Sequence, residues 1–170
     1  MVCMLRNMYI LDLVLVLTVD QPLFVIAKKI QWNWPDTYGE DKFVVMMGGL
    51  HIEMVFLKVL GDWLDGSGWV SVMTTANVTT DGRGDALKKG SFTARSQWAH
   101  QVTAAALFCL RNQAYNSYKV EAEAEGNPAM TFNDWCTLME TRHPQFRYWN
   151  KSFNLEVLFL QFMQSQREGN

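Results

Sequence analysis

Two short apolar runs in the first third of the chain, each closed by a polar or glycine-rich turn, constrain the fold most. The first run, Val14–Val19, consists of residues that favour strands and ends at Asp20. The second run, Phe43–Met47, ends at Gly48. An apolar run without alternation is typical of a strand that is buried on both faces of a parallel sheet. We therefore predict a strand at each run.

A helix is expected after each strand. Pro22 lacks the N–H that a central strand needs, but it suits the first turn of a helix, where that N–H would have no partner. Apolar residues recur at helical spacing over Leu23–Ile30, and a second amphipathic pattern covers Leu50–Leu64. The segment between them, Trp32–Glu40, contains turn-forming residues and is predicted to be a loop.

The strand–helix–strand order predicts where a site would lie. Such a connection within one sheet is almost always right-handed and joins parallel strands. Both strands then end at the same edge, which is where open α/β sheets usually bind ligands. Asp20 and His51 follow the two strand ends. Asp20 is therefore the first candidate for chemistry, and His51 is the second.

Helical patterns dominate the rest of the chain. A short helix is predicted over Trp69–Ala76 and a surface loop over Asn77–Gly90. The longest helical pattern covers Thr93–Glu123, and two further helices follow breaks at Gly126–Pro128 and His143–Pro144. One side of the longest helix carries Trp98, Val102, Cys109 and Leu110.

These patterns predict an α/β fragment of two parallel strands with a crossover helix, followed by a mainly helical region, so the fold is predominantly α. We expect a partial α/β unit over residues 1–66, a loop and short helix over 67–92, and a helical region over 93–170. A sheet of two strands is small. Either the first strand pairs with a segment upstream of this sequence, or the helices bury most of the apolar surface. Both interpretations suggest a piece of something larger.

Composition narrows the function classes. The chain has 170 residues, of which 49% are hydrophobic, and this is enough for a domain with a core. Its net charge of −2 argues against a strongly electropositive nucleic-acid surface. Cys3, Cys109 and Cys136 have no metal-binding spacing, which is typical of reduced thiols in a nuclear or cytoplasmic protein. The apolar N-terminal run lacks a signal-cleavage site and is too short to cross a bilayer, so no membrane partner is expected.

Several segments resemble a known family: Leu17–Phe24, Ile30–Met54 and Gly61–Trp69, and more loosely Ala99–Phe108 and His143–Trp149. They resemble the middle of an RNase H-like transposase core of the hAT and Mutator-like type. The resemblance is closer to uncharacterised transposon-associated open reading frames. It implies a truncated or domesticated transposase-like protein with DNA as its partner.

The resemblance also implies a metal site. Such a core uses two Asp and one Glu to hold two Mg²⁺ or Mn²⁺ ions for DNA strand cleavage and transfer. It would make Asp20 the second Asp, a relic metal ligand, and His51 the histidine of the motif that follows. Asp12 lies inside the first apolar run and does not fit the first Asp, while Glu156 and Glu168 are weak candidates for the closing Glu. With one carboxylate of three well placed, we expect neither catalysis nor a bound cofactor in isolation.

Simpler interpretations remain open for these residues. Asp20 also fits a carboxylate at a helix N-terminus, where the helix dipole favours a negative charge. His51 fits a partly buried histidine at a helix start. His100 and His143 are isolated in the sequence, and a structural role is expected for both.

The sequence also contains a loose basic patch, and an alternative function is considered beside it. Lys88, Lys89 and Arg95 are candidate phosphate contacts, but a solvated loop explains them better. The alternative to a transposase-like protein is a helical protein–protein interaction module with no nucleic-acid chemistry. That module would bind a protein partner through exposed faces of the long helices.

Overall fold

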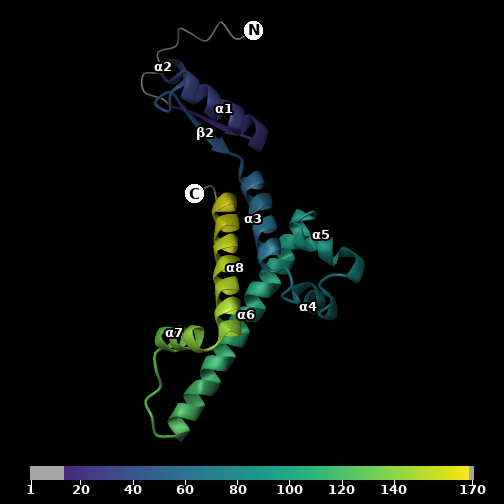
Figure 1. Cartoon of the computed structure of the whole chain (residues 1–170), viewed down its shortest axis with the longest axis vertical. Helices are drawn as coiled ribbons and strands as arrows, with labels where there is room; N and C mark the ends of the chain where they lie inside the picture. Colours follow the sequence, from purple (N-terminus) through teal and green to yellow (C-terminus); the bar gives the residue numbers. More distant parts are fainter. Residues whose placement is uncertain (1–13, 169–170) are drawn as a thin grey trace. The chain divides into compact units, whose positions relative to one another are not determined.

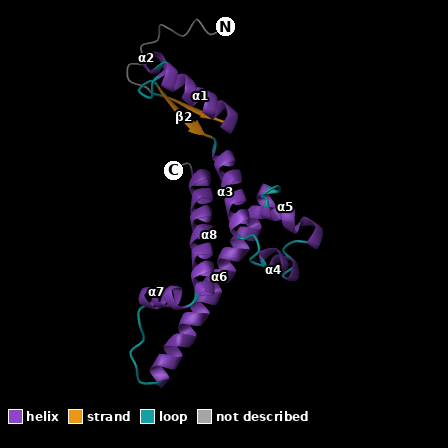
Figure 2. Cartoon of the chain, viewed as in Figure 1, coloured by secondary structure: helices purple, strands orange, loops and turns teal. Residues whose placement is uncertain are grey.

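A computed structural model of the chain describes residues 14–168, so Cys3 and Asp12 lie outside the described part. Helices make up most of this part, and two strands form one sheet (Figures 1 and 2). The elements are β1 (Leu15–Val19), α1 (Gln21–Asn33), α2 (Pro35–Tyr38), β2 (Phe43–Met47), α3 (Gly49–Trp63), α4 (Trp69–Thr75), the 3₁₀ helix η1 (Asp81–Arg83), α5 (Gly84–Lys88), α6 (Thr93–Ala124), α7 (Phe132–Arg142) and α8 (Pro144–Glu168). The predicted fold class, a small parallel α/β part and a mainly helical remainder, is confirmed.

The described residues form two compact units, and the boundary along the chain lies between Ile52 and Glu53. This division lies inside α3, whereas the sequence predicts a boundary at residue 66, just after the end of the same helix. None of the helices within residues 14–168 is long and apolar enough to cross a membrane.

The N-terminal unit contains the predicted parallel pair. β1 and β2 align Leu15 with Phe43 and Val19 with Met47, and α1 connects them. The side-chain amide of Gln31 in α1 donates a hydrogen bond of 2.7 Å to the carbonyl oxygen of Phe43. This bond holds the crossover helix against the sheet.

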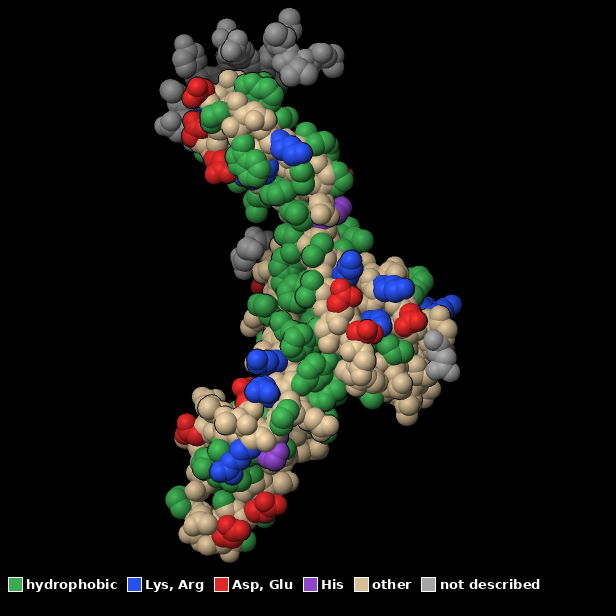
Figure 3. Space-filling model, viewed as in Figure 1, with side chains coloured by type: hydrophobic (Ala, Val, Ile, Leu, Met, Phe, Trp, Pro, Cys, Tyr) green, Lys and Arg blue, Asp and Glu red, His purple; other side chains and the backbone are tan. Residues whose placement is uncertain are grey.

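Burial of both sheet faces, which the unbroken apolar runs suggest, is not found within this unit. Val16, Val44 and Met46 are 56%, 37% and 51% exposed. Successive side chains of a strand alternate between faces, and these three lie on the face opposite the side chains of Leu17 and Val45, which line a pocket with α1. Figure 3 shows hydrophobic side chains (green) on the visible surface of this unit.

Two predicted loops are partly helical. Trp32 continues α1, and Pro35 opens α2 because proline is suited to the first turn of a helix. Within the segment Asn77–Gly90, η1 and α5 form because Leu87 is buried in a core cluster. Turn-forming residues mark both segments in the sequence, but burial of the Leu87 side chain favours helical structure in the second segment.

The helical unit is built on α6 and α8, which lie side by side (Figure 1). Its core has two clusters. The first contains Leu64, Trp69, Met73, Leu87 and Ala99, and the second contains Leu57, Leu60, Phe159 and Met163. The predicted α6 boundaries are confirmed, as are the turns before α7 and α8.

The buried face of α6 differs from the apolar side that its sequence marks. Trp98 and Leu110 are 50% and 60% exposed, whereas Ser96, His100 and Thr103 are buried. The hydroxyl of Ser96 donates to the carbonyl oxygen of Leu87 at 3.0 Å. Small and polar side chains let neighbouring elements approach α6 closely, so they occupy the packed face.

A substitution at Gly61 tests the close approach of α3 and α5 in the helical unit. A Cβ at this position of α3 would lie 1.8 Å from the carbonyl oxygen of Lys88. Gly61→Ala should therefore lower the free energy of unfolding by about 1–3 kcal/mol, as overpacked cores do. Gly82→Ala is the matched control, since a Cβ there meets nothing within 4 Å. Equal urea midpoints for the two variants would contradict this packing.

Candidate functional site

The predicted sheet edge exists in the N-terminal unit. The N–H of Gly48 donates to the carbonyl oxygen of Val19 at 2.8 Å, which holds the two strand ends together. Asp20 follows Val19 directly, and the Nδ1 of His51 lies 3.8 Å from the position that a Cβ on Gly48 would take. Asp20 and the turn that carries His51 thus lie on one edge, as predicted.

Asp20 acts as the N-cap of α1. Its Oδ1 accepts a hydrogen bond of 3.0 Å from the N–H of Leu23, and its side chain is exposed. His51 lies in the first turn of α3 and is half-buried. The simpler interpretation of Asp20, a carboxylate that satisfies a helix N-terminus, describes its contacts fully.

The other predicted carboxylates do not complete a metal site with the described residues. Glu156 is buried, and both of its oxygens face His100. Glu168 is exposed and accepts a hydrogen bond of 2.8 Å from Gln164. Within residues 14–168, no three His, Cys, Asp or Glu side chains are grouped so that they could hold an ion. These donors therefore do not fit a two-metal centre.

The predicted phosphate contacts differ in their surroundings. Lys88 is hydrogen-bonded to Asp65 and lies 4.0 Å from Asp85. The bond to Asp65 raises the pKa of Lys88, and Lys88 lowers the pKa of Asp65 in turn. Arg95 instead lines a small pocket together with Arg83, whereas Lys89 is exposed. A phosphate-contacting role for these three residues therefore stays a prediction.

The most unusual pair in the helical unit joins α6 to α8. His100 and Glu156 are both 1% exposed, and the His100 Nδ1 lies 3.0 and 2.9 Å from the two carboxylate oxygens. Trp69 stacks on the imidazole at 5.3 Å, and Phe159 meets it edge-on at 5.8 Å. If the carboxylate is ionised, Nδ1 must carry the proton of this contact, because an ionised carboxylate only accepts hydrogen bonds. The Nε2 is buried and has no hydrogen-bond partner within residues 14–168.

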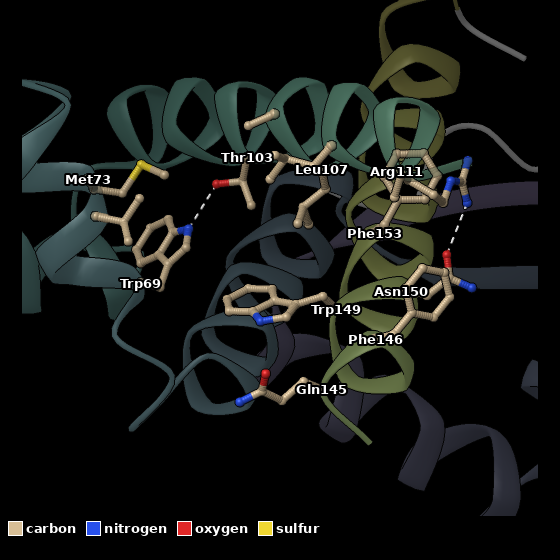
Figure 4. A pocket seen from close by; sticks show the side chains of 14 residues that line it. Trp69, Met73, Thr103, Leu107, Arg111, Gln145, Phe146, Trp149, Asn150 and Phe153 are labelled. Atoms are coloured by element: carbon tan, nitrogen blue, oxygen red, sulfur yellow. Dashed lines mark hydrogen bonds between the residues drawn. The ribbon is translucent and has the colours of Figure 1, made fainter. Parts of the chain in front are cut away.

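A groove of about 420 Å³ lies beside this pair, between α4, α6 and α8 (Figure 4). Aromatic and aliphatic side chains make up most of its lining. Its residues are Trp69, Val72, Met73, Thr103, Ala106, Leu107, Leu110, Arg111, Ala114, Gln145, Phe146, Trp149, Asn150 and Phe153. Trp69 contributes to both sites, because its ring covers His100 and its indole N–H donates to the Thr103 hydroxyl at 2.8 Å. The groove has the size and apolar lining of ligand-binding pockets.

Arg111 is the cationic side chain of this groove. Its guanidinium lies 4.1 Å from the ring centre of Phe153 and 5.0 Å from that of Phe132. It donates a hydrogen bond of 3.1 Å to the Asn150 side-chain oxygen, and its buried Nε has no partner in the described part of the chain. No carboxylate of residues 14–168 lies within 4 Å of it. Burial raises the pKa of the nearby Cys136 thiol, and the Arg111 charge opposes this rise.

Sequence reasoning did not find this groove. His100 is isolated in the sequence, and only a structural role is expected for it. A signal does exist in α8, because Phe146, Trp149 and Phe153 recur at helical spacing. The buried face of α8, which contains Glu156, lies on a different stripe, so the first half of this helix has more apolar surface than one seam needs.

Comparison with known proteins places the chain in a family. Residues 7–170 match the family described as a domain of unknown function (DUF8702), and the chain belongs to this family. No curated protein matches the chain. No solved structure matches it either.

The N-cap of α1 gives the first prediction of this site. Asp20→Ala should destabilise α1 by about 1 kcal/mol, because the Leu23 N–H loses its acceptor. Asp20→Asn should stay close to the original, since the amide oxygen can accept the same bond. Amide hydrogen exchange at Leu23 measures the effect, and unchanged protection in Asp20→Ala would contradict the capping role.

The buried pair gives the second prediction. Glu156→Ala should lower the free energy of unfolding by about 3 kcal/mol, because it leaves His100 buried without its partner. Glu168→Ala is the matched control: it removes an exposed glutamate from the same helix and should change stability by less than about 0.5 kcal/mol. Urea unfolding followed by tryptophan fluorescence compares the two. Similar losses in both variants would refute the importance of the pair.

Proposed function

We propose that the chain is a binding module whose helical unit holds the apolar part of a partner molecule in the groove between α4, α6 and α8. The observation that carries this proposal is the lining of the groove, which includes Trp69, Phe146 and Trp149 and contains few polar side chains. Burial of apolar surface there would drive binding. Binding of this kind needs no catalytic group and agrees with the interaction module expected from the long helices.

The contacts around the groove support a preformed site. Trp69 is fixed by its bond to Thr103, and Asn150 is fixed between Arg111 and Glu140, to which it donates at 2.6 Å. Side chains whose hydrogen bonds are already made lose little conformational freedom when a ligand binds. Preorganisation of this kind favours affinity.

Two alanines on α6 allow a direct test. Both Ala105 and Ala106 are exposed, but Ala106 lines the groove and Ala105 does not. Ala106→Trp should fill the groove and weaken binding of the uncharged dye N-phenyl-1-naphthylamine at least tenfold. Ala105→Trp, which adds the same side chain one residue away, should bind the dye as the unmodified chain does. Equal dye binding by both variants, or none by the unmodified chain, would contradict the proposal.

We also propose a transposase-derived origin as a second candidate, with DNA as partner in the nucleus or cytoplasm. The observation in its favour is the parallel β1–α1–β2 unit with Asp20 directly after β1, the arrangement that the resemblance implies. A small pocket lined by Arg83, Arg95 and Trp98 adds cationic and aromatic groups of the kind that contact single-stranded nucleic acid.

This second candidate predicts no nuclease activity for the isolated chain. Two-metal strand cleavage needs several carboxylates around a pair of ions, and Glu156 is turned inward onto His100. Supercoiled plasmid should therefore stay intact with Mg²⁺ or Mn²⁺, both with the unmodified chain and with Asp20→Ala. Metal-dependent nicking that disappears in Asp20→Ala would contradict this and restore a catalytic site.

A further inference from the structure

We infer that the groove selects an amphipathic anion: a molecule with a long apolar body and one carboxylate that pairs with Arg111. The inference rests on the proposed function and adds the chemical class of the ligand. Three features support it: the charge of Arg111, the unused hydrogen-bond capacity of the same side chain, and the length of the groove.

The charge comes from Arg111. Its guanidinium is stacked against Phe153 and Phe132, which removes part of its surface from water. Among the described residues, it has a neutral partner in Asn150 and no ionic partner. A partly desolvated cation gains more from a carboxylate than a solvated surface cation does, because the surrounding dielectric is lower. The groove therefore favours a negative ligand.

The unused hydrogen-bond capacity is that of the Arg111 Nε, which is buried and has no acceptor among the residues that the structure describes. Buried N–H groups nearly always have a partner, so a lone one marks a place where an acceptor oxygen would be favourable. Arginine also presents its N–H groups in a fixed plane that matches the two oxygens of a carboxylate. A carboxylate at this end of the groove would supply such oxygens.

The length follows from α6. The residues of α6 that line the groove run from Thr103 to Ala114, which corresponds to about 16 Å of helix at 1.5 Å per residue. Figure 4 shows Arg111 and Asn150 toward one end and Trp69 and Met73 toward the other, with Trp149 between them. One charged end and an apolar remainder match a chain with a single head group.

A head-group series tests the inference. Dodecanoate, dodecanol and dodecylammonium share one alkyl chain, and calorimetry below their aggregation concentrations measures the affinity of each. Dodecanoate should bind at least tenfold more tightly than dodecanol, and dodecylammonium more weakly than both. Shortening the carboxylate from dodecanoate to decanoate should weaken binding, by about fourfold for each methylene removed from the groove.

Matched variants assign the head-group preference to Arg111. Arg111→Met should remove the advantage of dodecanoate over dodecanol, while Lys151→Met, which removes an exposed charge of α8 outside the groove, should keep it. If Arg111→Met does not fold, the head-group series on the unmodified chain decides alone. Equal binding of dodecanoate and dodecanol to the unmodified chain would overturn the anion inference and leave the proposed function in place. Binding of none of the three would overturn both.

Discussion

The helical unit depends on the contact between His100 and Glu156. Both side chains are almost completely buried, and removing a charged or polar group from water costs free energy unless a partner replaces the water. The two must therefore meet, and this requirement fixes α6 and α8 in one register. Trp69 and Phe159 close over the imidazole, so α4 is positioned by the same pair.

The groove is a consequence of this register. α8 uses one stripe, with Ser152 and Glu156, for the buried seam, and another stripe, with Phe146 and Trp149, for the groove. Trp69 contributes to both the buried seam and the groove, because its ring stacks on His100 and it also lines the groove. A change at the buried pair should thus alter the groove, because they share a side chain.

How far the sequence predicts this structure depends on the range of each interaction. β1, α1 and β2 follow from local signals: two apolar runs, Asp20 with Pro22 at a helix start, and glycines after β2. The His100–Glu156 pair joins residues 56 positions apart, and no local pattern links them. The groove needs α4, α6 and α8 together, so its residues are recognised only in the fold. Glu156, a weak candidate for a metal ligand in the sequence, has its oxygens directed to a histidine instead.

The most direct test of this account is the protonation pattern of the His100 ring, measured by nitrogen–proton NMR on the whole chain. The structure predicts that the proton between Nδ1 and the Glu156 carboxylate exchanges slowly with water, because both side chains are buried. It also predicts ring signals shifted by the stacked Trp69. Rapid exchange of this proton with solvent would contradict the buried pair and the register built on it.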